Sequence, residues 1–269
     1  MNSLERVRLR PVRNLEYGIS SLHCWIRVFE AILRISYRLP FKKWTARTPE
    51  QKKIKEETKA QVQQRVFTTM SLRVDQPRPG GSGDSNDGNT ARTAFQQPEL
   101  FSAATGVDVE LIRRLHVILQ AVSCCLPLCG EKLSAFCSET AELYVRLYSW
   151  YPMTPTLHRL LMHSAALVEQ CLLPIGMMSE EASEARHKDV RLYRLQRARR
   201  DSRLNTMADV FGRLLVTSDP VISSSGASAR RNARSHSRRP LLAETQALLA
   251  EPMMQQPTAS DVIADSDSD

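Results

Sequence analysis

The sequence lacks the features that assign many proteins to a class at first sight. None of its apolar runs approaches the ~20 residues that span a bilayer. The charged start, residues 1–14, has no apolar segment of the kind that follows the charges of a secretory signal. Neither the apolar–polar alternation of a half-buried strand nor an internal repeat occurs. These absences predict a helical protein with no membrane partner.

The six cysteines form no CxxC pair. Cys124, Cys125 and Cys129 cluster around Pro127, but a thiolate zinc site normally uses paired spacing. Free thiols are typical of proteins in a reducing compartment. We therefore expect a nuclear or cytoplasmic protein that is not secreted.

A nucleotide-binding loop is also missing. The glycine-rich run at 80–83 follows no strand, and no GK[ST] comes after it. Its composition instead predicts a flexible linker over residues 76–98.

The formal net charge is +8. A strongly basic balance favours a polyanionic partner, with nucleic acid first and an acidic membrane surface second. Solubility alone is the other interpretation.

Apolar residues recur every three or four positions over much of the chain, which predicts helices. The clearest stripe runs from Leu15 to Leu33. The expected organisation is an N-terminal helical pair in 1–75, the linker, a helical body in 99–217, and a disordered tail in 218–269 that is basic and then acidic. Within the tail, residues 241–250 can form a short helix.

The stretch 155–208 combines three kinds of chemistry. It begins with His158 and His163, which are five residues apart and so point about 140° apart on a regular helix. Two ordinary histidines fit that spacing better than a zinc pair, for which four residues is easier.

A carboxylate cluster and a basic run follow. Glu180, Glu181 and Glu184 open a helix, where they either stabilise its N-terminus or bind a hard cation such as Mg²⁺. Guanidinium groups bind phosphate through two parallel hydrogen bonds, so the basic run predicts nucleic-acid contacts. Its members are Arg186, Lys188, Arg191, Arg194, Arg197, Arg199, Arg200 and Arg203.

Five short motifs in this order resemble the C-terminal part of Transib-type DNA transposases, and hence the catalytic core of the vertebrate recombination-activating recombinase. The sequence is more similar still to uncharacterised, transposon-derived arthropod proteins. The resemblance covers roughly residues 15 to 218. Its motifs are LHC at 22–24, NDGNTAR at 86–92, LHRLLMH at 157–163, IGMMSEEASEARHK at 175–188 and RLYRLQRARR at 191–200.

The resemblance implies a ribonuclease H-like family in which two aspartates and a glutamate bind two Mg²⁺ ions. It implies that Glu184 is the glutamate, that His158 and His163 bind zinc, and that Arg191 and Arg194 face phosphate. The family's aspartates and CxxC precede its LHC motif, whereas residues 1–21 here contain neither Asp nor Cys. A two-metal reaction needs ligands for both ions.

The sequence therefore predicts a mainly α fold, the helical C-terminal flank of a ribonuclease H-like transposase core without its sheet. Its predicted function is that of a transposase-derived, catalytically incomplete protein that binds DNA through phosphates, with Glu184 vestigial. One alternative is a helical interaction module, or homo-oligomer, that uses an exposed Leu15–Leu33 stripe. Another is a fragment of an active metal-dependent transposase.

Overall fold

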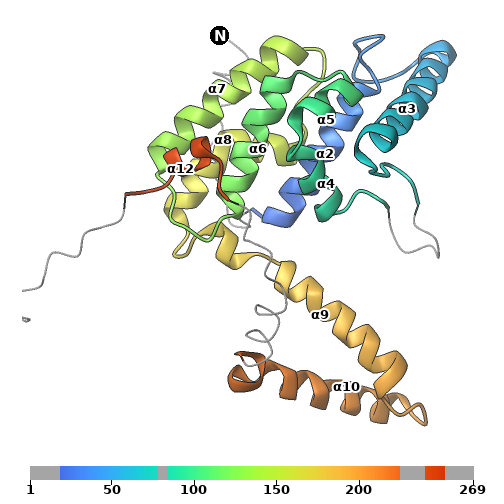
Figure 1. Cartoon of the computed structure of the whole chain (residues 1–269), viewed down its shortest axis with the longest axis vertical. Helices are drawn as coiled ribbons and strands as arrows, with labels where there is room; N and C mark the ends of the chain where they lie inside the picture. The colour runs from blue at the N-terminus through green and yellow to red at the C-terminus, as the bar shows by residue number, and fades with distance from the viewer. Residues whose placement is uncertain (1–18, 78–83, 225–239, 252–269) are drawn as a thin grey trace, which may run out of the picture.

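The computed structural model describes residues 19–77, 84–224 and 240–251. These residues form helices and no strand, with two isolated bridges (Figure 1). The elements are α2 Ser21–Ser36, α3 Pro49–Met70, α4 Gly88–Phe95, α5 Pro98–Thr105, α6 Val109–Ser123, α7 Gly130–Tyr148, α8 Pro155–Gln170, the 3-10 turn η1 Ile175–Met178, α9 Glu181–Leu192, the π-helical turn η2 Tyr193–Arg197, α10 Arg203–Ser218 and α12 Ala243–Ala247.

Side-chain caps explain where several of these helices begin. Thr48 and Gln51 form a reciprocal capping box at the start of α3, followed by a proline in the first turn. Asp108 and Thr154 each accept a hydrogen bond from a backbone N–H in the first turn of α6 and α8. Gly106, at φ 75°, ends α5 in the left-handed conformation that glycine adopts without strain.

Helix α2 lies at the centre of the body and packs against α4, α6 and α8. Its Phe29 ring is stacked on Phe101 with centroids 5.5 Å apart, and Phe95 meets Phe101 edge to face. All three phenylalanines are fully buried. Such aromatic contacts add to the hydrophobic stabilisation of the core.

Three sequence-based expectations are wrong in this region. The predicted linker at 76–98 contains α4, whose Ala91, Ala94 and Phe95 are buried. The helical pair of 1–75 is not separate from the body, because α2 shares one core with α6 and α8. The stripe from Leu15 to Leu33 is not exposed, since α2 buries its members Leu22, Phe29 and Leu33; Leu15 lies outside the described residues.

The C-terminal expectations are confirmed in part and wrong in part. The short helix predicted within 241–250 is present as α12. The predicted disorder is wrong over residues 218–224, which are mostly helical, and over residues 240–251, which pack on the body. Leu248 is buried in the core, and the Cys129 N–H donates to its carbonyl at 2.9 Å. Gln120 of α6 donates to the Pro240 carbonyl and accepts from the Leu242 N–H. These bonds attach the segment to α6. The remaining predicted disorder, at 225–239 and 252–269, and the basic residues Arg230–Arg239 lie outside the described residues.

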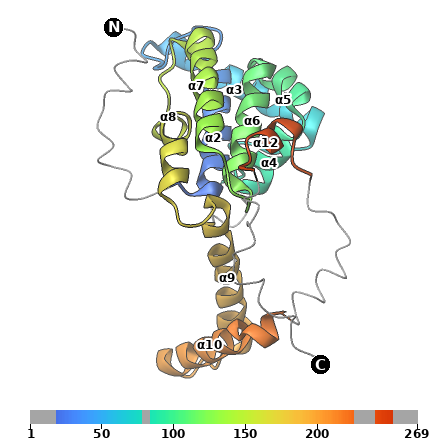
Figure 2. The same ribbon diagram turned by 90° about the vertical axis from the view of Figure 1, so that its left-hand side faces the viewer.

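Helices α9 and α10 form an arm that projects from the base of the body (Figures 1 and 2). Their principal contacts are with η2 and with each other. In both views α10 turns back beneath α9. We call residues 181–218 the arm.

Candidate nucleic-acid interface

Segments from distant parts of the sequence converge where the arm leaves the body. A Cβ on Gly88, the first residue of α4, would lie 2.5 Å from Leu22 Cδ1, so glycine allows α4 to approach α2 closely. Asp87 caps α4 by accepting from the Thr90 N–H at 2.8 Å. The LHC and NDGNTAR motifs are therefore in direct contact.

Arg92 connects this junction to the arm. Its guanidinium carbon lies 5.5 Å from the centre of the Trp25 ring, a cation–π distance. The same guanidinium forms an ion pair with Glu181 in the first turn of α9. Trp25 is itself fixed, because its indole N–H donates to the Ser123 hydroxyl at 2.8 Å.

Glu180 makes a second connection at the same place. It accepts a hydrogen bond from the Ser20 hydroxyl at 3.2 Å and lies 3.3 Å from His23 Nδ1. Ser21 also donates to Ser179 at 3.2 Å. Two of the three carboxylates predicted as a cation-binding cluster are thus bonded to the body.

Gly176 in η1 provides the closest backbone contact at the junction. A Cβ there would lie 2.4 Å from the Ser123 carbonyl oxygen and 2.3 Å from that of Cys124. Both obstructing atoms belong to the backbone at the end of α6, so they cannot move aside as a side chain can. Only glycine therefore fits this position.

Two arginines of the predicted basic run hold the arm together. Arg186 bonds to Asp189 at 3.0 Å and to the Leu214 carbonyl at 3.2 Å, which joins α9 to α10. Arg199 binds both carboxylate oxygens of Asp209, at 2.9 and 3.0 Å. The hydrogen bonds from Arg199 lower the pKa of Asp209 to about 2, so this pair is charged at neutral pH.

A third arginine, Arg200, donates to the Leu195 carbonyl within the same turn. These internal bonds leave a different subset of the run facing solvent. Its members are exposed and form no ion pair in the part of the chain that the structure describes: Lys188, Arg191, Arg194, Arg197 and Arg203. We call these five residues the arm cations.

Glu184 is exposed in the first turn of α9, the helix that also carries the arm cations Lys188 and Arg191. The other two glutamates of the predicted cation-binding cluster have partners on the body: Glu180 contacts His23, and Glu181 forms an ion pair with Arg92. Among residues 19–77, 84–224 and 240–251, no three His, Cys, Asp or Glu side chains are placed to hold a metal. The residues present do not fit the two-metal site that the resemblance implies.

His158 and His163 lie closer together than their spacing suggested. Their ring centres are 5.3 Å apart in an edge-to-face arrangement on α8. Burial, and secondarily the charge of Arg159, lowers the pKa of His163, which favours its neutral form. Tetrahedral zinc needs more donors than these two rings supply, and the described residues add none beside them.

A comparison with models of known protein families found no match, and a comparison with curated proteins found no significant match. The resemblance to transposases stays a prediction from the five motifs. Along the described ranges, no helix combines the length and the apolar character that crossing a membrane requires.

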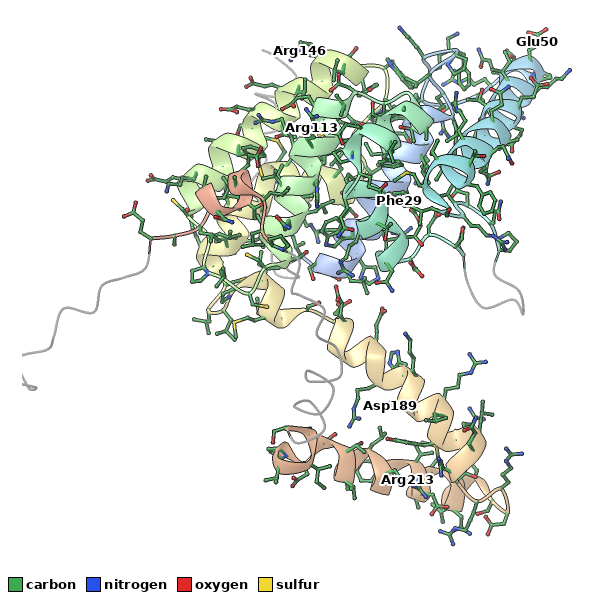
Figure 3. The ribbon with its side chains drawn as sticks, viewed as in Figure 1. Phe29, Glu50, Arg113, Arg146, Asp189 and Arg213 are labelled. Carbon is green, nitrogen blue, oxygen red and sulfur yellow. The ribbon has the colours of Figure 1, made fainter. Side chains whose placement is uncertain are left out.

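The sequence patterns did not identify several exposed cations of the arm and body as candidate binding residues. Arg213 is exposed on α10, outside the basic run (Figure 3). Lys42, Lys43 and Arg47 are exposed in the loop between α2 and α3. The signal in the loop was the cluster of cations around Trp44, which lies within no periodic segment.

We predict that Gly176→Ala destabilises the protein by about 1–3 kcal/mol, because the new methyl group overlaps rigid backbone. Urea unfolding measures the change. Gly130→Ala is the matched control: its Cβ would meet only the flexible end of Glu169. Equal losses in the two variants would contradict the role of Gly176 as a tight backbone contact.

Proposed function

We propose that this protein binds nucleic acid through the arm cations, as a transposase-derived protein that does not itself cut DNA. The observation that carries the proposal is the separation of the basic run into two sets. Arg186 and Arg199 stabilise the arm, and the five arm cations remain exposed along α9, η2 and the first residue of α10. A nucleic-acid partner agrees with a nuclear or cytoplasmic location.

The dimensions of the arm suit a phosphate backbone. Lys188, Arg191, Arg194 and Arg197 are spaced three residues apart, so they follow a shallow spiral around α9 and η2. A helix about 10–12 Å in diameter fits a B-DNA major groove about 12 Å wide. Among the described residues, α9 contacts the body near its first turn and otherwise packs mainly on η2 and α10, so it extends away from the body toward a long partner (Figure 2).

The distribution of carboxylates supports binding without cleavage. Of the three predicted cation ligands, Glu180 and Glu181 contact His23 and Arg92 of the body, and Glu184 remains. A single carboxylate cannot hold the two metal ions that phosphodiester transfer uses in this family of reactions. Glu184 is vestigial in this proposal.

We expect the double variant Arg191→Gln, Arg194→Gln to bind duplex DNA roughly tenfold more weakly near 50 mM salt. Loss of two phosphate contacts should reduce the slope of log K against log salt by about 2. Fluorescence anisotropy with a labelled duplex measures both quantities at several salt concentrations.

The matched control is Lys132→Gln, Arg146→Gln, which removes the same charge from exposed positions of α7. Figure 3 places Arg146 at the end of the body remote from the arm. Equal weakening by the control, or no binding by the native protein at this salt, would refute the arm as the interface.

A second candidate function is self-association through α10. Val210 is the buried residue of α10, whereas the exposed residues Leu204, Met207, Phe211 and Leu215 recur at spacings of three and four on another side of the helix. Leu204 is 79% exposed and Phe211 is 61% exposed. An apolar stripe of this length on one helix is typical of an interaction surface.

We infer that the partner is a second copy of α10 in antiparallel orientation. We place the two helices in the register in which Leu204 meets Leu215 of the second copy. Phe211 then lies over Ala208, and Met207 lies over Gly212. Leucine thus packs on leucine at the two ends, and Phe211 and Met207 oppose small residues. A Cβ on Gly212 would meet nothing within 4 Å, which leaves room for the partner. The pairing is two-fold symmetric, as most homodimer interfaces are.

Phe211→Asp should convert a dimer into a monomer, because it places a charge at the centre of the apolar stripe. Sedimentation equilibrium measures the mass. Ile54→Asp is the control, since Ile54 is an exposed apolar residue on α3, outside the arm. A native protein that is monomeric at tens of micromolar would exclude this second function and leave the first intact.

A further inference from the structure

A second basic surface lies at the loop between α2 and α3, on the body. Trp44 in this loop is 57% exposed. It borders two hollows, one of about 700 Å³ and one of about 540 Å³. The first is also lined by Arg38 and Tyr151, and the second by Lys42, Lys43, Arg47 and Trp150. An exposed indole between two hollows has no role in the core.

The loop holds Trp44 in place through Arg38. The Arg38 Nε–H donates to the Trp44 carbonyl at 3.0 Å, and its Nη1 donates to the Arg34 carbonyl at 2.7 Å. The guanidinium carbon lies 5.6 Å from the centre of the Tyr151 ring. Lys42 has a φ of 44°, a left-handed conformation that costs a non-glycine residue energy. The turn is therefore maintained by its surroundings.

Cations surround the exposed ring. Lys42, Lys43, Arg47 and Lys52 are exposed and, within the described ranges, show no ion pair. Other cations nearby are already neutralised, because Arg34 pairs with Glu30 and Lys55 pairs with Glu56. We call Trp44 and these four unpaired cations the loop site.

The chemistry of the loop site distinguishes between two polyanions. An anionic membrane would favour several apolar side chains projecting together, but Trp44 is the one large apolar residue of the 37–48 loop that is mostly exposed. A single indole with space beside it suits the stacking of an unpaired base. Lysine and arginine at its rim suit the phosphates that join such bases.

We propose that the loop site binds single-stranded nucleic acid, with one base stacked on Trp44 and its phosphates on Lys42, Lys43, Arg47 and Lys52. This inference deepens the proposed function, on which it rests for the class of partner. It does not depend on the arm, because the two surfaces share no residue. A protein with both surfaces would hold duplex on the arm and an unpaired strand on the body.

The test is Trp44→Ala in the full chain, titrated with a labelled oligothymidine of about 15 nucleotides at low salt. Loss of one stacked base should lower the affinity roughly tenfold, while Trp44→Phe should retain most of the binding. The oligonucleotide should also quench tryptophan fluorescence in the native protein and much less in Trp44→Phe. Because Trp44 is exposed, an unchanged melting temperature is expected for both variants.

Three measurements distinguish failure of this proposal from failure of the proposed function: binding to the single strand, to duplex DNA and to lipid vesicles. If Trp44→Ala weakens binding of the single strand and leaves duplex binding unchanged, the loop site is supported even when the arm variant fails. If native protein and Trp44→Ala bind the oligonucleotide equally, the loop site is refuted. Trp44-dependent binding to vesicles of anionic phospholipid, with no Trp44-dependent binding to the oligonucleotide, would also overturn it and identify a membrane contact instead.

Discussion

The arrangement of this molecule depends on the guanidinium of Arg92, which lies between the Trp25 ring and the Glu181 carboxylate. Trp25 belongs to the central helix and Glu181 to the first turn of the arm. A cation placed over an indole is stabilised by the ring, and its remaining charge attracts the carboxylate at the helix N-terminus. This contact, with the close backbone approach at Gly176, fixes where the arm begins.

As a consequence, the charged side chains fall into two groups: some hold the arm in place, and others face solvent. Acidic side chains near the junction are used to attach the arm, and Asp209 is used to close it onto Arg199. The arm cations of α9 and η2 do not take part in these attachments, and they face solvent. A helix attached at one end, whose cations form no ion pair with the residues that the structure describes, presents a positive surface away from the body. Such a surface favours encounter with a polyanion.

Local rules predicted part of the fold well. Apolar spacing predicted helices over much of the chain, and residues near in sequence explain where two of them begin: Asp108 caps α6, and Thr48 with Gln51 caps α3. Helix α4 was missed because glycine and aspartate, typical of loops, serve there for close approach to Leu22 and for capping. The docking of residues 240–251 was missed because nothing local in a short apolar segment indicates its distant partner on α6. The sequence also did not predict which arginines of the basic run are bonded within the arm, because partners of Arg186 and Arg199 lie on α10, which folds back onto α9.

Hydrogen exchange of the full chain with and without duplex DNA tests the central claim most directly. The account predicts that duplex slows exchange of amides in residues 186–203 and leaves the α5–α7 region of the body unchanged, because the partner lies on the arm. Slowed exchange across the body with none in 186–203 would contradict it, since the polyanion would then bind a surface other than the arm cations.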